Sequence, residues 1–175
     1  MDDIASAMDA FRHFTEPRDG VGNNPFRLAC SFDPPLGQAE IKSAWPSSSI
    51  PDELVRAWST SGSSVLFEDV DYGQWGLKLL SPQDAARRTL QESTQRPAVY
   101  RGDDVVIGEF LGDQDLVVFA PSEVGCRRVL VALPTDGRSD WYAVAGSLAE
   151  FLDRYLHELG DKYWEDAGQA WSSRL

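Results

Sequence analysis

The sequence predicts an α+β fold, because most of its expected strands follow one another directly while its expected helices lie near the two ends and in one insertion. Apolar residues recur at helical spacing in the outer stretches. The centre instead carries short apolar or alternating runs separated by turn residues. The 175 residues, 42% hydrophobic and 11% aromatic, are enough to bury a core without disulfides or metals.

Helices are expected where apolar residues recur every three or four positions after a capping signal. Residues 81–93 begin with a serine cap and a proline in the first turn, and we expect Leu90 on their buried side. Residues 147–159 begin with a capping box and carry the longest apolar stripe of the chain. A helix over residues 51–60 is expected to end at Gly62 in a left-handed cap. Further helices are expected at residues 4–11, 38–45 and, more weakly, 161–175.

Strands are expected in the apolar runs between these helices. The run at residues 105–110 and the run at 116–120 are joined by Gly112-Asp113-Gln114-Asp115, a sequence typical of a tight hairpin turn. Antiparallel pairing of neighbours is therefore the expected arrangement. The other strand candidates are residues 63–68, 75–80, 129–133 and 141–144.

Composition also predicts a division of the chain. Residues 1–36 contain a cluster of proline, glycine and asparagine after their helix, and we interpret them as an N-terminal extension that packs loosely on the remainder. Residues 37–160 form the expected main domain. Residues 161–175 form an expected C-terminal helical tail, with Tyr163, Trp164 and Trp171 as its docking points.

The charge restricts the classes of partner. Twenty-eight acidic against sixteen basic residues give a net charge of −12, which disfavours binding to nucleic acids and to anionic membranes. The same charge attracts a basic protein, although acidity that serves only solubility is the alternative. Cys30 and Cys126 are far apart and predict reduced thiols. An acidic start and the lack of long apolar runs predict a cytoplasmic protein.

Residues for catalysis are scarce. The two histidines, His13 and His157, lie in no metal-binding or nucleophile-activating pattern, so we expect no enzyme, cofactor or metal. One alternative stays open. The pairs Asp69/Asp71 and Asp113/Asp115 alternate in the way that lets oxygen ligands converge on a divalent cation, as in a metal-dependent hydrolase.

The acidic residues are unevenly distributed. Residues 103–123 contain six acids and no lysine or arginine, and residues 68–72 add three acids next to a tyrosine. Acids set beside aromatic residues on loops are typical of a protein-binding surface. A solvated rim around a core tryptophan, Trp75, would give the same pattern. The predicted partner-binding residues are Asp69, Asp71, Tyr72, Asp103, Asp104, Asp113 and Asp115.

Three motifs, in order, resemble those of the SUKH superfamily and span roughly residues 38–156. They are the helix start at residues 50–54 with its end at 61–62, the glycine-aspartate hairpin at 107–116, and the closing helix at 144–152. The chain departs from the usual residues at Ile50, Ser61 and Leu148, all mild changes of size. The resemblance implies a bent antiparallel β-sheet flanked by helices.

The resemblance also implies a function. Bacterial SUKH proteins are mostly immunity proteins, which bind and neutralise toxin domains, often nucleases, delivered between competing cells. The expected partner is therefore a cognate, basic toxin. The alternative is a non-catalytic regulatory or scaffolding protein of the same fold that binds a host partner.

Overall fold

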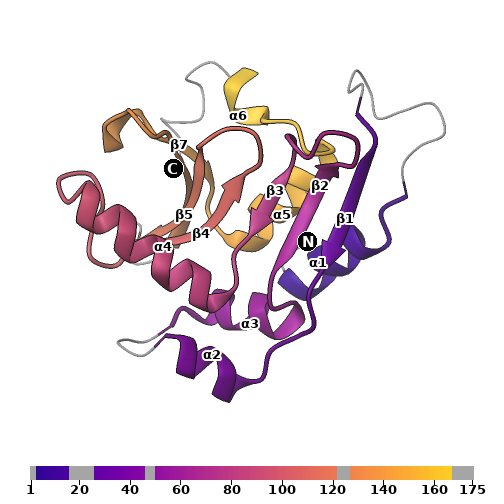
Figure 1. The fold of residues 1–175 in the computed structure, drawn as a ribbon, viewed down its shortest axis with the longest axis horizontal. Coiled ribbons are helices and arrows are strands. Elements are labelled where there is room, and N and C mark those ends of the chain that lie inside the picture. The colour runs from indigo at the N-terminus through magenta and orange to yellow at the C-terminus, as the bar shows by residue number, and fades with distance from the viewer. Residues whose placement is uncertain (1–2, 16–25, 46–49, 122–126, 167–175) are drawn as a thin grey trace.

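The fold is built on one antiparallel sheet of seven strands in chain order, and the predicted α+β class is confirmed (Figure 1). The computed structural model describes residues 3–15, 26–45, 50–121 and 127–166. Each strand pairs with its sequence neighbour, so no crossover connection is needed. The strands are β1 (Leu28–Phe32), β2 (Ser64–Asp69), β3 (Leu77–Leu79), β4 (Val105–Phe110), β5 (Leu116–Pro121), β6 (Arg127–Ala132) and β7 (Tyr142–Ala145).

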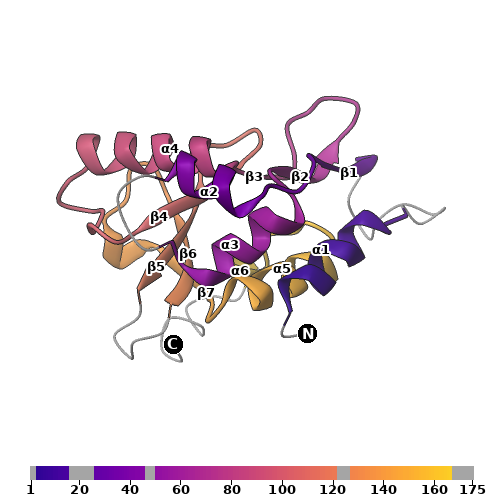
Figure 2. The same cartoon turned by 90° about the horizontal axis from the view of Figure 1, so that it is seen from below.

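Helices cover both faces of this sheet. Figure 2 shows α4 on one side and both α1 and α5 on the opposite side. No helix in the described part of the chain is long and apolar enough to cross a membrane. The helices are α1 (Ile4–Arg12), α2 (Gln38–Ala44), α3 (Asp52–Thr60), α4 (Pro82–Gln95), α5 (Leu148–His157) and α6 (Tyr163–Asp166), with a 3₁₀ turn at Arg138–Asp140.

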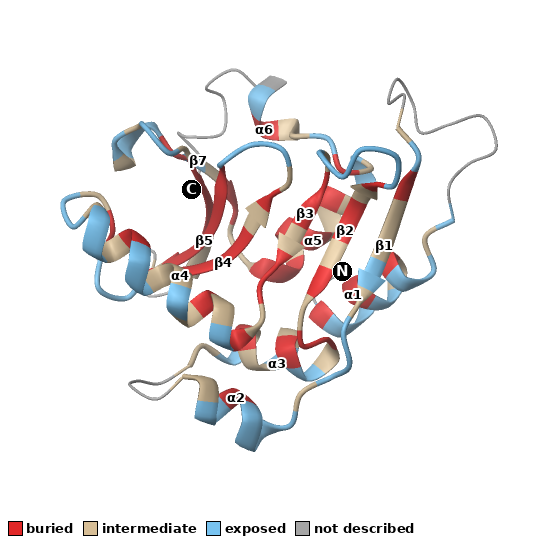
Figure 3. Cartoon of the chain, in the orientation of Figure 1, coloured by how far each residue is buried: buried red, intermediate tan, exposed pale blue. Residues whose placement is uncertain are grey.

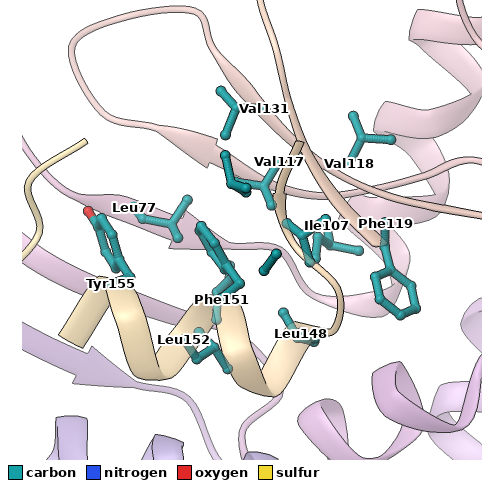
Figure 4. Packing of buried hydrophobic residues seen from close by; sticks show 14 of the residues in the cluster. Leu77, Ile107, Val117, Val118, Phe119, Val131, Leu148, Phe151, Leu152 and Tyr155 are labelled. Carbon is teal, nitrogen blue, oxygen red and sulfur yellow. The ribbon is translucent and has the colours of Figure 1, made fainter. Parts of the chain in front are cut away.

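The main core lies between α5 and the sheet. Leu148, Phe151, Leu152 and Tyr155 of α5 are all at most 1% exposed, as their helical spacing predicts (Figures 3 and 4). The Ser147 hydroxyl accepts a hydrogen bond from the backbone N–H of the third helical residue, which confirms the predicted cap. Their partners on the sheet include Leu77, Ile107, Val117 and Val131.

The N-terminal segment does not pack loosely. Ile4, Met8 and Phe11 of α1 are at most 3% exposed within the same core, and α1 lies against α3 and α5. The following strand β1 pairs with β2 at the edge of the sheet. This strand was missed because its short sequence, which contains alanine, cysteine and serine, gives little strand signal. The division of the chain at residues 36 and 160 stays a prediction.

Helix α4 is rotated relative to its predicted orientation. Leu90 is 68% exposed, so its expected burial was wrong. The side facing the sheet carries Ala85, in agreement with the helical spacing, together with Thr89 and Glu92, and the Thr89 hydroxyl accepts a hydrogen bond from the backbone N–H of Val106 at 2.9 Å. The orientation of α4 is thus set by the backbone N–H of Val106, which needs an acceptor, rather than by burial of Leu90.

Gly62 is required for a reason other than the predicted one. It is absent from the described residues of positive φ, so the left-handed cap was a wrong interpretation. Its N–H donates to the carbonyl oxygen of Pro34 at 2.9 Å. A Cβ at this position would lie only 2.9 Å from the same oxygen, so the close approach of two backbones requires the glycine.

Two glycines of positive φ provide a matched test of packing after α5. Gly160 has φ +89, and an added Cβ would lie 3.0 Å from the Phe67 side chain; Gly73 has φ +66 and open space around it. We expect Gly73→Ala to lower the free energy of unfolding by about 1–2 kcal/mol through backbone strain alone. Gly160→Ala should lose about 1–3 kcal/mol more because it overpacks the core. Equal losses in urea denaturation would contradict this packing.

Candidate partner-binding site

Two acidic loops that are distant in sequence lie side by side at one end of the sheet (Figure 1). Residues 70–76 join β2 to β3, and residues 111–115 join β4 to β5. The backbone N–H of Leu111 donates to the Gly76 carbonyl at 2.9 Å. A Cβ on Gly112, which has φ +83, would lie 2.0 Å from the Gln74 carbonyl oxygen. Only glycine allows this contact, which brings the two predicted acidic pairs together.

The first loop is held by a buried carboxylate. Asp69 is 1% exposed, and its Oδ1 accepts a hydrogen bond from the backbone N–H of Asp71 at 3.0 Å. This bond orders the turn and leaves Tyr72, 75% exposed, and Asp71 at the surface. Asp69 therefore shapes the loop from inside, whereas the side chains of Asp71 and Tyr72 are accessible to solvent. Trp75 is half-buried against Phe26.

The second loop binds a lysine of the same chain. The Lys162 ammonium donates to the carboxylates of Asp113 at 2.6 Å and Asp115 at 2.7 Å, and it lies 4.9 Å from the centre of the Phe110 ring. Asp113 stays exposed, whereas Asp115 is only 9% exposed. Sequence analysis missed Lys162, because a single lysine in a weakly helical tail carries no signal of its distant partners.

The segment carrying Lys162 is docked firmly. Trp164 is 4% exposed, with its ring 5.5 Å from Phe110 and 6.3 Å from Phe151. The Tyr163 hydroxyl donates to the Val144 carbonyl at 3.0 Å. Both predicted docking points are therefore confirmed, while the third, Trp171, lies outside the described residues. The tail thus forms one wall of the site.

Asp103 and Asp104 lie away from the two acidic loops. They precede β4, whereas Asp113 and Asp115 follow it, so a six-residue strand of roughly 20 Å separates the two pairs. The Asp104 side chain is 0% exposed and accepts two hydrogen bonds from Arg138, at 2.5 and 2.9 Å. Asp103 is exposed, but Asp104 has a structural role, so we leave both out of the proposed surface.

A cavity of about 150 Å³ lies where the two loops meet the tail. Trp75, Phe110 and Tyr155 form its aromatic lining, and Asp113 and Lys162 form its polar side. The Tyr155 hydroxyl is buried, and it has no hydrogen-bond partner among the described residues. Burial raises the pKa of this phenol well above its ordinary value, so the group is neutral at physiological pH.

The groups at this end of the sheet determine which chemistry it could support. Within the described ranges, no group of three or more histidine, cysteine, aspartate or glutamate side chains is placed to hold a metal ion. The Asp113/Asp115 pair, a candidate for a cation in sequence analysis, has the Lys162 ammonium as its partner. What remains accessible is a tyrosine, carboxylates and a small aromatic cavity, which are groups suited to contact with another molecule.

The buried ion pair of Arg138 and Asp104 yields a stability prediction. Arg138→Met keeps most of the side-chain stem but leaves a fully buried carboxylate without its cation, so we expect a loss of about 3–5 kcal/mol in the free energy of unfolding. The control is Arg87→Met, since Arg87 is 77% exposed where it pairs with Asp84; its loss should stay within about 1 kcal/mol. Similar losses for the two variants in denaturant titrations would contradict the structural role of Asp104.

Lys162 yields a prediction about alkaline pH. Burial opposes its charge, but the hydrogen bonds to Asp113 and Asp115 outweigh burial and raise its pKa above the ordinary 10.5. The resulting stability is fully present below pH 10.5 and is lost as the pH rises through the folded-state pKa. The stability difference between wild type and Lys162→Met should therefore shrink above pH 10.5. A difference that stays constant up to pH 12, or one matched by Lys42→Met on exposed α2, would contradict it.

No protein-family model matches the chain, and no curated protein matches it significantly. The resemblance to the SUKH superfamily therefore depends on the three motifs themselves, and what it implies is a proposal.

Proposed function

We propose that this chain binds a basic partner protein through the loop surface, which we define as Asp71, Tyr72, Gln74 and Asp113 with the neighbouring Lys162 segment. The observation that carries the proposal is the meeting of two acidic loops, the first of which carries an exposed aromatic side chain. Tyr72 is 75% exposed, so its ring is available for contact with another molecule. Tyrosines of this kind, surrounded by charges, are frequent anchors of interfaces.

Within this class, the role that fits best is that of an immunity protein of the SUKH superfamily. The three motifs of the resemblance form helix α3, the β4–β5 hairpin and the β7–α5 segment, which is the order and type of element that the resemblance requires. The antiparallel α+β architecture is also compatible with it. On this proposal the target is a toxin domain, and the chain has no catalytic step of its own.

The proposed mechanism is occlusion by charge mimicry. A toxin that acts on an anionic substrate such as a nucleic acid needs a basic active-site surface. The net charge of −12 steers such a surface toward the chain and speeds the encounter. Once docked, the carboxylates of the loop surface take the place of the substrate's phosphates, so the toxin is blocked without being modified.

The experiment is co-purification of the tagged chain from its source organism, with the genes adjacent to its own co-expressed, at low and at high salt. The immunity role is supported if a basic polypeptide encoded by an adjacent gene is captured, if high salt weakens this capture, and if the chain inhibits the toxicity of that polypeptide. Capture of a host regulator instead supports the alternative scaffolding role. Capture of no partner at any salt concentration would overturn the proposal. The acidic surface would then be explained by solubility alone.

Two variants of the first loop test the surface itself. Asp71→Lys should slow association with the captured partner about three- to tenfold at low salt, because Asp71 is exposed and its ion pair with Arg27, at 3.5 Å, is a weak surface contact. Tyr72→Ala should mainly speed dissociation, by about tenfold or more.

The control is Asp9→Lys on α1, which makes the same change of charge at another exposed position. Association rates from surface plasmon resonance that fall equally for Asp9→Lys and Asp71→Lys would show only a general charge effect. Asp113 and Asp115 are unsuitable for this test, since changing them also releases Lys162.

A further inference from the structure

We propose that the cavity between the two loops and the tail is a binding pocket for an arginine side chain of the partner. This inference rests on the proposed function, because it specifies which basic group the loop surface accepts. It uses the lining of the cavity, its charge and the unpartnered hydroxyl of Tyr155.

One cation, the ammonium of Lys162, is already bound at the edge of this cavity. The Lys162 ammonium lies over the Phe110 ring and has three carboxylates within 4 Å, from Asp113, Asp115 and Glu165. Three negative charges around one positive charge leave a net negative site. A second cation beside Lys162 therefore meets attraction from the carboxylates that exceeds repulsion from the ammonium. An anionic ligand would meet the opposite balance.

Size and shape favour a guanidinium group. A cavity of about 150 Å³ is comparable to one that holds a single benzene ring, and a guanidinium is a smaller planar group. Its faces stack on aromatic rings, here that of the half-buried Trp75, and its five N–H donors can serve several acceptors at once. A second lysine would place one compact ammonium close to Lys162 and would use the aromatic lining less well.

The buried Tyr155 hydroxyl provides the polar contact. Tyr155 is 0% exposed, and Figure 4 shows its ring pointing from α5 toward β3, with the hydroxyl at the far end. A hydroxyl left without a partner costs about 1–3 kcal/mol, and a guanidinium N–H would satisfy it. The indole N–H of Trp75 also has no partner among the described residues. An arginine within a peptide brings carbonyl oxygens that can accept from it.

The test is an NMR titration of the full chain with N-acetyl-L-arginine N-methylamide. The reporter is the indole N–H signal of Trp75, assigned by its loss in Trp75→Phe. We expect saturable binding in the millimolar range. The matched probe N-acetyl-L-citrulline N-methylamide has the same shape without the charge and should bind at least fivefold more weakly, and the corresponding lysine probe should also bind more weakly.

Tyr155→Phe and Tyr100→Phe are the matched variants, because each removes a buried hydroxyl that has no hydrogen-bond partner among the described residues, and of the two only Tyr155 lines the cavity. Tyr155→Phe should weaken binding of the arginine probe about tenfold, whereas Tyr100→Phe should leave it unchanged. Both should fold normally, since neither loses a hydrogen bond.

Four outcomes would overturn the arginine pocket: no saturable shift of Trp75, equal binding of citrulline, tighter binding of lysine, or equal effects of the two variants. None of them depends on a partner protein, so this failure is distinct from failure of the proposed function. A chain that binds the probe yet captures no basic partner would retain the pocket and lose the immunity role.

Discussion

The packing of α5 on the sheet is the contact on which the rest of the molecule depends. Tyr155, at its centre, has its ring 5.7 Å from Phe67 of β2, 6.2 Å from Phe110 of β4 and 5.8 Å from Phe151 of α5. Burying four large side chains of one helix contributes roughly 6–12 kcal/mol before the entropy of ordering the chain is subtracted. The same helix contacts α1 and leads directly into the tail, so it ties both ends of the described chain to the sheet.

A strained residue joins this core to the candidate site. Phe67 has φ +56, a conformation that costs a non-glycine residue roughly 1–2 kcal/mol. With this positive φ, two consecutive side chains of the strand, Leu66 and Phe67, are both buried at 0% exposure. Phe67 then meets Phe11, Phe14 and Tyr155 edge-on, and its ring leaves room only for glycine at residue 160. The aromatic packing of Phe67 thus offsets its backbone strain. The same packing restricts the turn at Gly160, which precedes the tail that carries Lys162.

Sequence patterns predicted the elements that depend on local information. The apolar stripe of α5, its serine cap and the hairpin of β4 and β5 were predicted correctly because neighbouring residues determine them. The errors concern residues whose surroundings come from far along the chain. Leu90 was expected inside, but a backbone donor of β4 fixes the face of α4. For the site, the meeting of the two acidic loops depends on Gly112 lying against Gln74, a contact that spacing alone does not show.

The formal charge of a surface differs from the charge that a partner meets. Of the six acidic residues predicted from sequence to bind a partner, Asp104 is neutralised by Arg138, and Asp113 and Asp115 share Lys162. Asp69 is turned inward to order its own loop. The net charge of −12 and its long-range field survive these pairings and would speed encounter with the proposed basic partner, whereas short-range contacts would be made by the few groups that remain accessible. On the proposed function, specificity therefore depends on shape, on Tyr72 and the aromatic cavity, more than on the number of acids in the loop surface.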